Sequence, residues 1–220
     1  MVTWLQTFVR SSVGKKACMA ISGLLLVGFL VAHLAGNLTL FLPDDGAAFD
    51  AYAQKLHDLG PLLYVAEVGL LALFVVHIAF AAWTTIGNRK ARTSRYAVQP
   101  DHGERTVASS TMPITGLIVL LFLIVHLIHF RLDERFEQGP FDLVEGTLAG
   151  PIAALIYIVG VLALTLHLTH AIGSALQTLG VNHPRWSPLL RRAGVGLALI
   201  LGLGFLSIPI YALIAWGGSN

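Results

Sequence analysis

The sequence predicts an all-α integral membrane protein in which five transmembrane helices form a single bundle over residues 1–220. Its composition is 55% hydrophobic and 12% charged, whereas a soluble domain carries about 25% charged residues. Five apolar stretches each reach about 20 residues, the length that crosses hydrocarbon roughly 30 Å thick at about 1.5 Å per residue. The expected spans are residues 17–41, 62–86, 112–130, 152–179 and 190–216.

The distribution of basic residues predicts the orientation of the bundle. Eleven of the 14 lysines and arginines lie before the first span, between the second and third, and between the fourth and fifth; the others are Lys55, Arg131 and Arg135. Cytoplasmic loops carry the excess of positive charge in membrane proteins. We therefore expect a protein of the cell inner (cytoplasmic) membrane, with its N-terminus in the cytoplasm and its C-terminus outside.

The connections between the spans are expected to differ in kind. A helical pattern over residues 48–59 precedes Pro61, which suits the first turn of the second span. The basic segment 87–111 is expected to face anionic lipid headgroups or a docked protein. The third span is expected to begin near Pro113, and an acidic linker with a Gly139–Pro140 turn leads to the fourth. The sequence shows no evident internal repeat, and a chain without a soluble domain is not expected to bind nucleic acid.

Four of the five spans carry a histidine well inside the membrane: His33, His77, His126 and His167. Imidazole is costly to place in hydrocarbon without a partner, so an intramembrane histidine indicates a functional site. Counted from the cytoplasmic ends of the spans, His33 and His126 lie roughly 21–24 Å up. His77 and His167 lie roughly 14–18 Å up. The sequence therefore predicts an outer pair, His33 with His126, and an inner pair, His77 with His167.

Two pairs of neutral imidazoles in a bundle core are typical of two b-type haems, each held non-covalently by two histidines. Cys18 is the single cysteine, which excludes a CxxCH attachment site for covalent haem and a CxxC metal site. Small residues near the histidines would let flat porphyrins approach the helix backbones: Gly28, Ala32, Gly36, Ala81, Gly116, Gly160 and Gly173. The alternative is that each histidine bonds to a neighbouring helix and that these small residues only pack between spans.

Three further polar residues lie near the predicted ligands. His129 and His170 each lie one turn from a ligand, on nearly the same face. We prefer His126 and His167 as ligands because of their depth. His129 then lies at the outer interface, and His170 lies nearer the inner interface, where it can contact a haem propionate; the alternative for both is contact with water. Glu67, the one carboxylate within a span, and His129 are the candidates for quinone contact or proton transfer, although Glu67 can instead be a residue reached by water.

Extended motifs around these residues resemble the single-chain, two-haem cytochrome b anchors of succinate:quinone oxidoreductases and fumarate reductases (respiratory complex II). The resemblance covers nearly the whole chain. It rests on SSVGKKACMAISG leading to HLAGN around His33, KLHDLGP before the second span, EVGLLALFVVHIAFAAWT around His77, TGLIVLLFLIVHLIHF around His126, and YIVGVLALTLHLTHAIGSALQTLG around His167. In that family, the histidines that match the outer pair hold the haem far from the soluble subunits, and those that match the inner pair hold the near one.

The resemblance implies one subunit of an enzyme of the respiratory chain and the tricarboxylic acid cycle. A flavoprotein subunit with FAD would act on succinate or fumarate, and an iron–sulfur subunit would relay electrons to this chain. The two haems would then pass them to membrane quinone, of the menaquinone type. FAD and Fe–S clusters are expected on the partner subunits only, since this chain has no dinucleotide fingerprint and no cysteine cluster.

Two alternatives to this interpretation remain from the sequence. One is a cytochrome b anchor of another respiratory dehydrogenase, such as a hydrogenase or a formate dehydrogenase. The other is a non-redox transporter or structural anchor, in which the histidines serve a substrate, protons or packing. Composition does not separate the three, whereas the register of the motifs favours the first interpretation.

Overall fold

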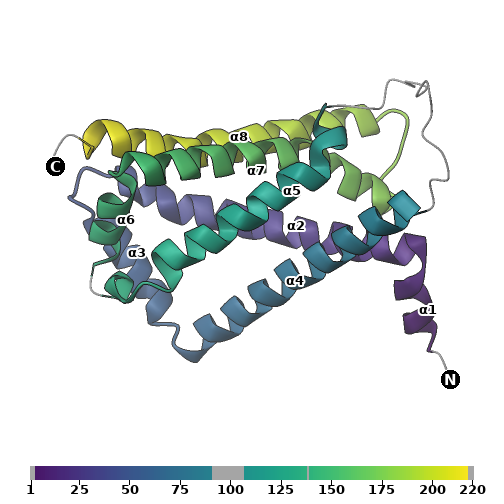
Figure 1. The fold of residues 1–220 in the computed structure, drawn as a ribbon, viewed down its shortest axis with the longest axis horizontal. Helices are drawn as coiled ribbons and strands as arrows, with labels where there is room; N and C mark the ends of the chain where they lie inside the picture. Colours follow the sequence, from purple (N-terminus) through teal and green to yellow (C-terminus); the bar gives the residue numbers. More distant parts are fainter. Residues whose placement is uncertain (1–2, 91–106, 138, 218–220) are drawn as a thin grey trace.

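The computed structural model describes residues 3–90, 107–137 and 139–217, and it shows a bundle of long helices with shorter helices at its ends (Figure 1). The long helices are α2 (Ser12–Asn37), α4 (Pro61–Lys90), α5 (Val107–His126), α7 (Pro151–Thr178) and α8 (Ser187–Ala215). Together with the turns that extend α2 and α5, they give five segments long and apolar enough to cross a membrane. The described part of the chain contains no strand. The predicted all-α fold with five candidate spans is therefore confirmed.

The helices extend further at the predicted cytoplasmic side than the sequence suggested. α2 begins at Ser12, α4 continues to Lys90, and α5 begins at Val107. The third span was expected to begin near Pro113, but this residue lies inside α5. Hydropathy marks only the apolar part of a span, whereas long basic side chains let a helix continue into the headgroup region. The expected basic loop is correspondingly shorter, and its central part, residues 91–106, lies outside the described residues.

Short helices fill the ends of the bundle: α1 (Trp4–Arg10), the 3-10 helix η1 (Leu38–Phe41), α3 (Ala47–His57), the π-helical turn η2 (Leu127–Arg131), the 3-10 helix η3 (Glu134–Glu137) and α6 (Pro140–Leu148). The predicted helix over 48–59 is confirmed as α3, and Pro61 is the first residue of α4. α6 was not predicted. It begins at the proline that suggested a turn, because proline also suits the first helical position.

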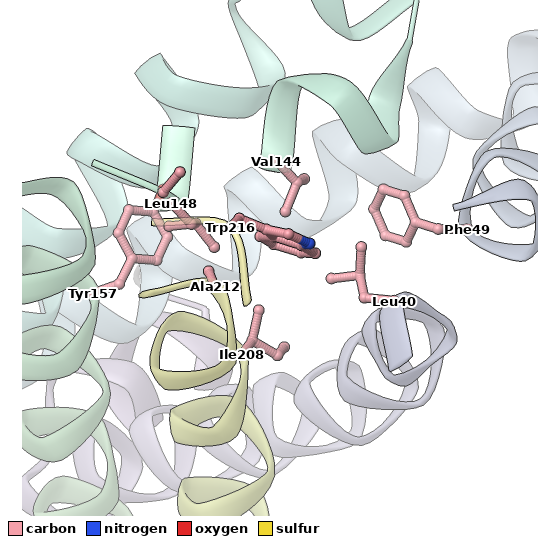
Figure 2. Close-up of a cluster of buried hydrophobic side chains, with 9 residues drawn as sticks. Leu40, Phe49, Val144, Leu148, Tyr157, Ile208, Ala212 and Trp216 are labelled. Atoms are coloured by element: carbon pink, nitrogen blue, oxygen red, sulfur yellow. The ribbon is translucent and has the colours of Figure 1, made fainter. Parts of the chain in front are cut away.

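An apolar cluster, called the outer cap because it lies on the predicted outer side, closes the end of the bundle opposite α1 (Figure 1 and Figure 2). It joins η1, α3, α6, α7 and α8 through Leu40, Phe49, Val144, Leu148, Ala149, Tyr157, Ile208, Ala212 and Trp216. Figure 2 shows Trp216, just after α8, at the centre of the cluster. The Phe141 N–H of α6 also donates to Asp50 Oδ1 of α3 over 2.9 Å. The two short outer helices are thereby fixed to each other and to the spans.

Gly36 provides the close contact between α2 and the outer cap. A Cβ atom at this position would overlap the ring of Tyr52 on α3. We predict that Gly36→Ala lowers the free energy of unfolding by about 1–3 kcal/mol, the usual cost of overpacking. Thermal unfolding in detergent would measure it. Gly69→Ala on α4 is the matched control, because a Cβ there meets nothing within 4 Å. Equal stability of the two variants would contradict this contact.

The five spans differ in how fully they are packed. α7 and α8 lie side by side along the length of the bundle, and both contain several buried residues (Figure 1). α4 is the opposite case. It packs extensively only along α2 and has no buried residue. The histidine of α4 therefore comes from the most loosely packed span.

Candidate functional site

The outer histidine pair is brought together as predicted. The ring centroids of His33 on α2 and His126, the last residue of α5, lie 5.8 Å apart, with the ring planes at 89°. Two imidazoles that bind one metal from opposite sides have centroids about 6 Å apart, since each metal–nitrogen distance is about 2 Å. The ring of Phe29 stacks on His33 at 5.2 Å, and that of Phe205 lies 5.8 Å away. The partner of His33 is thus on the third span, not on the second.

The first inner histidine, His77, is held by the neighbouring helix α2. Its Nδ1 atom lies 3.1 Å from the backbone oxygen of Met19 and 3.3 Å from Ser22 Oγ. A carbonyl oxygen only accepts hydrogen bonds, so we assign the ring hydrogen to Nδ1. The lone pair of the ring then lies on Nε2, on the far side of the imidazole. This is the tautomer that can bind a metal through Nε2.

The second inner histidine, His167 on α7, is held in the same way by α5. Its Nδ1 atom lies 3.3 Å from Thr115 Oγ1, and it also hydrogen-bonds to the backbone of Met112. His77 and His167 are close enough to interact electrostatically. Each inner histidine is therefore fixed by the helix that carries one of the outer histidines.

An internal repeat underlies this symmetry, contrary to the expectation from the sequence. Residues 19–37, MAISGLLLVGFLVAHLAGN, align without gaps with residues 112–130, MPITGLIVLLFLIVHLIHF. In both segments the outer histidine follows the methionine by 14 residues. The inner histidines each follow the first proline of their span, Pro61 or Pro151, by 16 residues. Spans that repeat with the same direction are related by an axis along the membrane normal, which places equivalent histidines opposite each other.

His129 lies near the same aromatic residue as His126, as their one-turn spacing predicted: both rings have centroids 5.9 Å from that of Tyr157. A π-helical turn, η2, begins directly after His126, and the Leu132 N–H donates to the Leu127 carbonyl five residues back. The wider turn brings the His129 ring into a stack with Tyr157 of α7, at 5.9 Å and 13°. π-Helical turns are frequent at functional sites.

Two polar atoms in this stack have no hydrogen-bond partner among the described residues. They are His129 Nδ1 and the Tyr157 hydroxyl oxygen, and both are fully buried. Tyr157 is only 6% exposed, and its ring also lies 5.9 Å from that of His126. An unpaired buried polar group costs about 1–3 kcal/mol, so such groups point to a missing partner. The Nδ1 atom of His129 is thus shielded, although the residue as a whole is only half-buried.

Glu67 forms an ion pair with the end of the same π-helical turn. Arg131 Nε and Nη2 donate to the two carboxylate oxygens over 2.7 and 2.9 Å. The Glu67 side chain is 32% exposed and that of Arg131 is 50% exposed. In the repeat, Glu67 and Tyr157 occupy the same position, 10 residues before the inner histidine. η2 therefore presents His129 to one copy of that position and Arg131 to the other.

His170 and the glycines expected to make room for haem have different surroundings in the structure. His170 on α7 lies close enough to Arg191 of α8 for an electrostatic interaction, and both lie toward the predicted cytoplasmic end. Gly116 faces the His167 ring: a Cβ atom at this position would lie 3.4 Å from Cε1 of His167. Gly36 and Gly160 are instead filled by aromatic rings, those of Tyr52 and Phe122, and so serve helix packing. Gly28 has open space around it.

An apolar groove of about 400 Å³ runs between α5 and α7, beside the outer pair. It is lined by Ile118, Leu121, Phe122, Val125, Leu155, Ile156, Val159 and Gly160. Phe122 lies at its inner wall, where its ring contacts those of both His126 and Tyr157. Phe122 thus connects the lining of the groove with the ring of Tyr157.

The residues present fit haem in their donor chemistry. The described residues contain no group of three or more histidine, cysteine or acidic side chains placed to hold a metal ion. A b-type haem needs only two axial ligands from the protein, and neutral imidazoles supply them without adding charge to the interior. Comparison with protein-family models, curated proteins and solved structures found no match.

Proposed function

We propose that this chain is the two-haem cytochrome b anchor of a succinate:quinone oxidoreductase or fumarate reductase. The observation that carries the proposal is the arrangement of the intramembrane histidines. The outer pair has ring centroids 5.8 Å apart, and both inner histidines are held through Nδ1 by a neighbouring helix. The haems, when bound, supply one-electron transfer between an iron–sulfur subunit and membrane quinone. The succinate or fumarate site lies on the flavoprotein subunit.

The chain's own residues hold and orient the two haems. His33 and His126 would hold the outer haem, and His77 and His167 would hold the inner haem. His170, with the nearby Arg191, offers positive charge and hydrogen-bond donors for an inner-haem propionate. The basic N-terminal side faces the cytoplasm, where the flavoprotein and iron–sulfur subunits dock.

The outer end of the bundle provides the quinone site. The buried hydroxyl of Tyr157 and Nδ1 of His129 are suited to hydrogen-bond a quinone carbonyl, and they lie beside the outer ligand His126. The apolar groove between α5 and α7 accepts the isoprenoid tail, since it has the size and apolar lining of a small-molecule site. Glu67, a carboxylate near the predicted outer end of α4, exchanges the proton with the outer solution.

Optical spectroscopy of the purified chain in native lipid tests the proposal. We expect a b-type α-band in the dithionite-reduced minus oxidised spectrum, and two haems per chain. Co-purification with identification of the partner subunits distinguishes this complex from a hydrogenase or formate dehydrogenase. A lipid-containing preparation without a b-type α-band would rule out a redox role and leave the transporter or structural anchor.

Glu67→Gln is expected to lower quinone-linked turnover while leaving haem content unchanged. An exposed ion pair is worth at most about 1 kcal/mol, so loss of stability does not explain the effect. Asp133→Asn is the control, since it removes the other described outer ion pair, with Arg135. The guanidinium of Arg135 lowers the pKa of Asp133 to about 2, so that carboxylate stays ionised near neutral pH and carries no proton. Normal turnover of Glu67→Gln would remove Glu67 from the quinone site.

A further inference from the structure

Two hydroxyl side chains are buried among the apolar residues of the spans. Ser22 is 3% exposed and Thr115 is 4% exposed. The Ser22 hydroxyl lies 2.8 Å from the backbone oxygen of Cys18, and the Thr115 hydroxyl lies 3.2 Å from that of Thr111. Each hydroxyl has one hydrogen, which is used within its own helix. The lone pairs of both oxygens therefore remain available to accept a hydrogen bond.

Those lone pairs face the inner histidines. Nδ1 of His77 and Nδ1 of His167 lie 3.3 Å from Ser22 Oγ and Thr115 Oγ1, respectively. The two hydroxyls occupy the same position in the internal repeat, three residues after Met19 and Met112. The structure thus shows the same contact made twice, once at each inner histidine.

A glycine follows each hydroxyl residue and faces the same imidazole. A Cβ at Gly23 would lie 3.0 Å from Cε1 of His77, which is too close for an undisturbed contact. The equivalent distance at Gly116 is 3.4 Å, to Cε1 of His167, which is an ordinary van der Waals contact. The glycine therefore makes room for the ring at His77, whereas at His167 it only lies against the ring.

The outer pair has no such arrangement. Within the described part of the chain, neither the His33 ring nor the His126 ring makes a hydrogen bond; their contacts are with aromatic rings such as Phe29 and Phe122. A hydrogen bond from Nδ1–H makes an imidazole a stronger donor through Nε2 and fixes its orientation. The inner and outer ligands consequently differ in donor strength.

We propose that Ser22 and Thr115 are positioning residues of the inner haem, which rests on the proposed function. With the carbonyls of Met19 and Met112, they fix the Nε2-binding tautomer of His77 and His167. The stronger electron donation stabilises the ferric state, and it lowers the midpoint potential of the inner haem only.

Ser22→Ala and Thr115→Val in the complete complex test this role by redox titration of each haem. Both substitutions are expected to raise the midpoint potential of the inner haem and to shift the EPR signal of its ferric form. Replacing a residue that hydrogen-bonds to a metal-bound histidine typically lowers the metal affinity by about 10- to 100-fold. A tenfold weaker preference for the ferric state corresponds to an upward shift of about 59 mV. The outer haem is expected to keep its potential.

Matched variants separate positioning from general packing. Ser22→Thr and Thr115→Ser keep the hydroxyl and are expected to keep the potential. Ser207→Ala removes a hydroxyl on α8 that donates to the Gly204 backbone and contacts no histidine, so both haems should be unchanged. An unmoved inner potential in Ser22→Ala and Thr115→Val, or equal shifts of both haems, overturns the inference. A wild-type chain without haem instead refutes the proposed function itself.

Discussion

His33→Ala and His126→Ala are each expected to remove the same haem, and to reduce b-type absorbance by about half. The rings of these residues are neighbours, so losing either one breaks the two-histidine coordination of one iron. His77→Ala and His167→Ala are expected to remove the other haem. Haem content per chain, combined with redox titration of the remaining haem, measures which one is lost.

The pattern among the variants is more informative than any single loss. The double variant of His33 and His126 should lose no more haem than either single variant, because both act on one site. His57→Ala in α3 is the control, since this exposed histidine lies outside the spans. Added imidazole should restore the haem in His33→Ala if the fold is intact. Loss of one common haem in His33→Ala and His77→Ala would show that the two-level arrangement is wrong.

The sequence was sufficient for the spans and for the outer pairing because both depend on regular helices. A rise of about 1.5 Å per residue converts sequence position into depth, and the counts placed His33 level with His126. The same arithmetic placed His77 level with His167, and that pairing stays a prediction. The repeat was present in the sequence as well. The motifs MAISG and MPITG lie at equal distances before His33 and His126 and would have revealed it.

Features that depend on tertiary contacts were not predictable in this way. The segment Leu127–Arg131 has no glycine or proline to mark the π-helical turn that carries His129. The bond between Glu67 and Arg131 joins residues 64 positions apart. Tyr157 resembled an ordinary aromatic residue of a span until the fold buried its hydroxyl without a partner. The pattern of apolar residues shows which face of a helix a residue occupies, but it does not show which residues of other helices contact that face.

Tyr157→Phe provides the sharpest test of the proposed quinone site. In the described structure the hydroxyl is buried and unpaired, so removing it should not destabilise the resting protein and should relieve part of a cost of about 1–3 kcal/mol. A quinone would lose one hydrogen bond of about 1.5 kcal/mol, which corresponds to roughly a tenfold loss in quinone-linked kcat/KM. We therefore expect turnover to fall while thermal stability stays equal or rises.

The opposite signs of these two effects distinguish a binding role from a structural one. Haem content should be unchanged, because the Tyr157 ring that packs beside His126 remains in place. Tyr211→Phe on α8 is the control, since Tyr211 packs against Phe41 and Trp216 and lies away from the His129 stack. Lower stability with normal turnover in Tyr157→Phe would show that the hydroxyl has a structural partner. Lower turnover with unchanged stability would mean that the missing partner is the substrate, because a structural hydrogen bond cannot be lost without a cost in folding free energy.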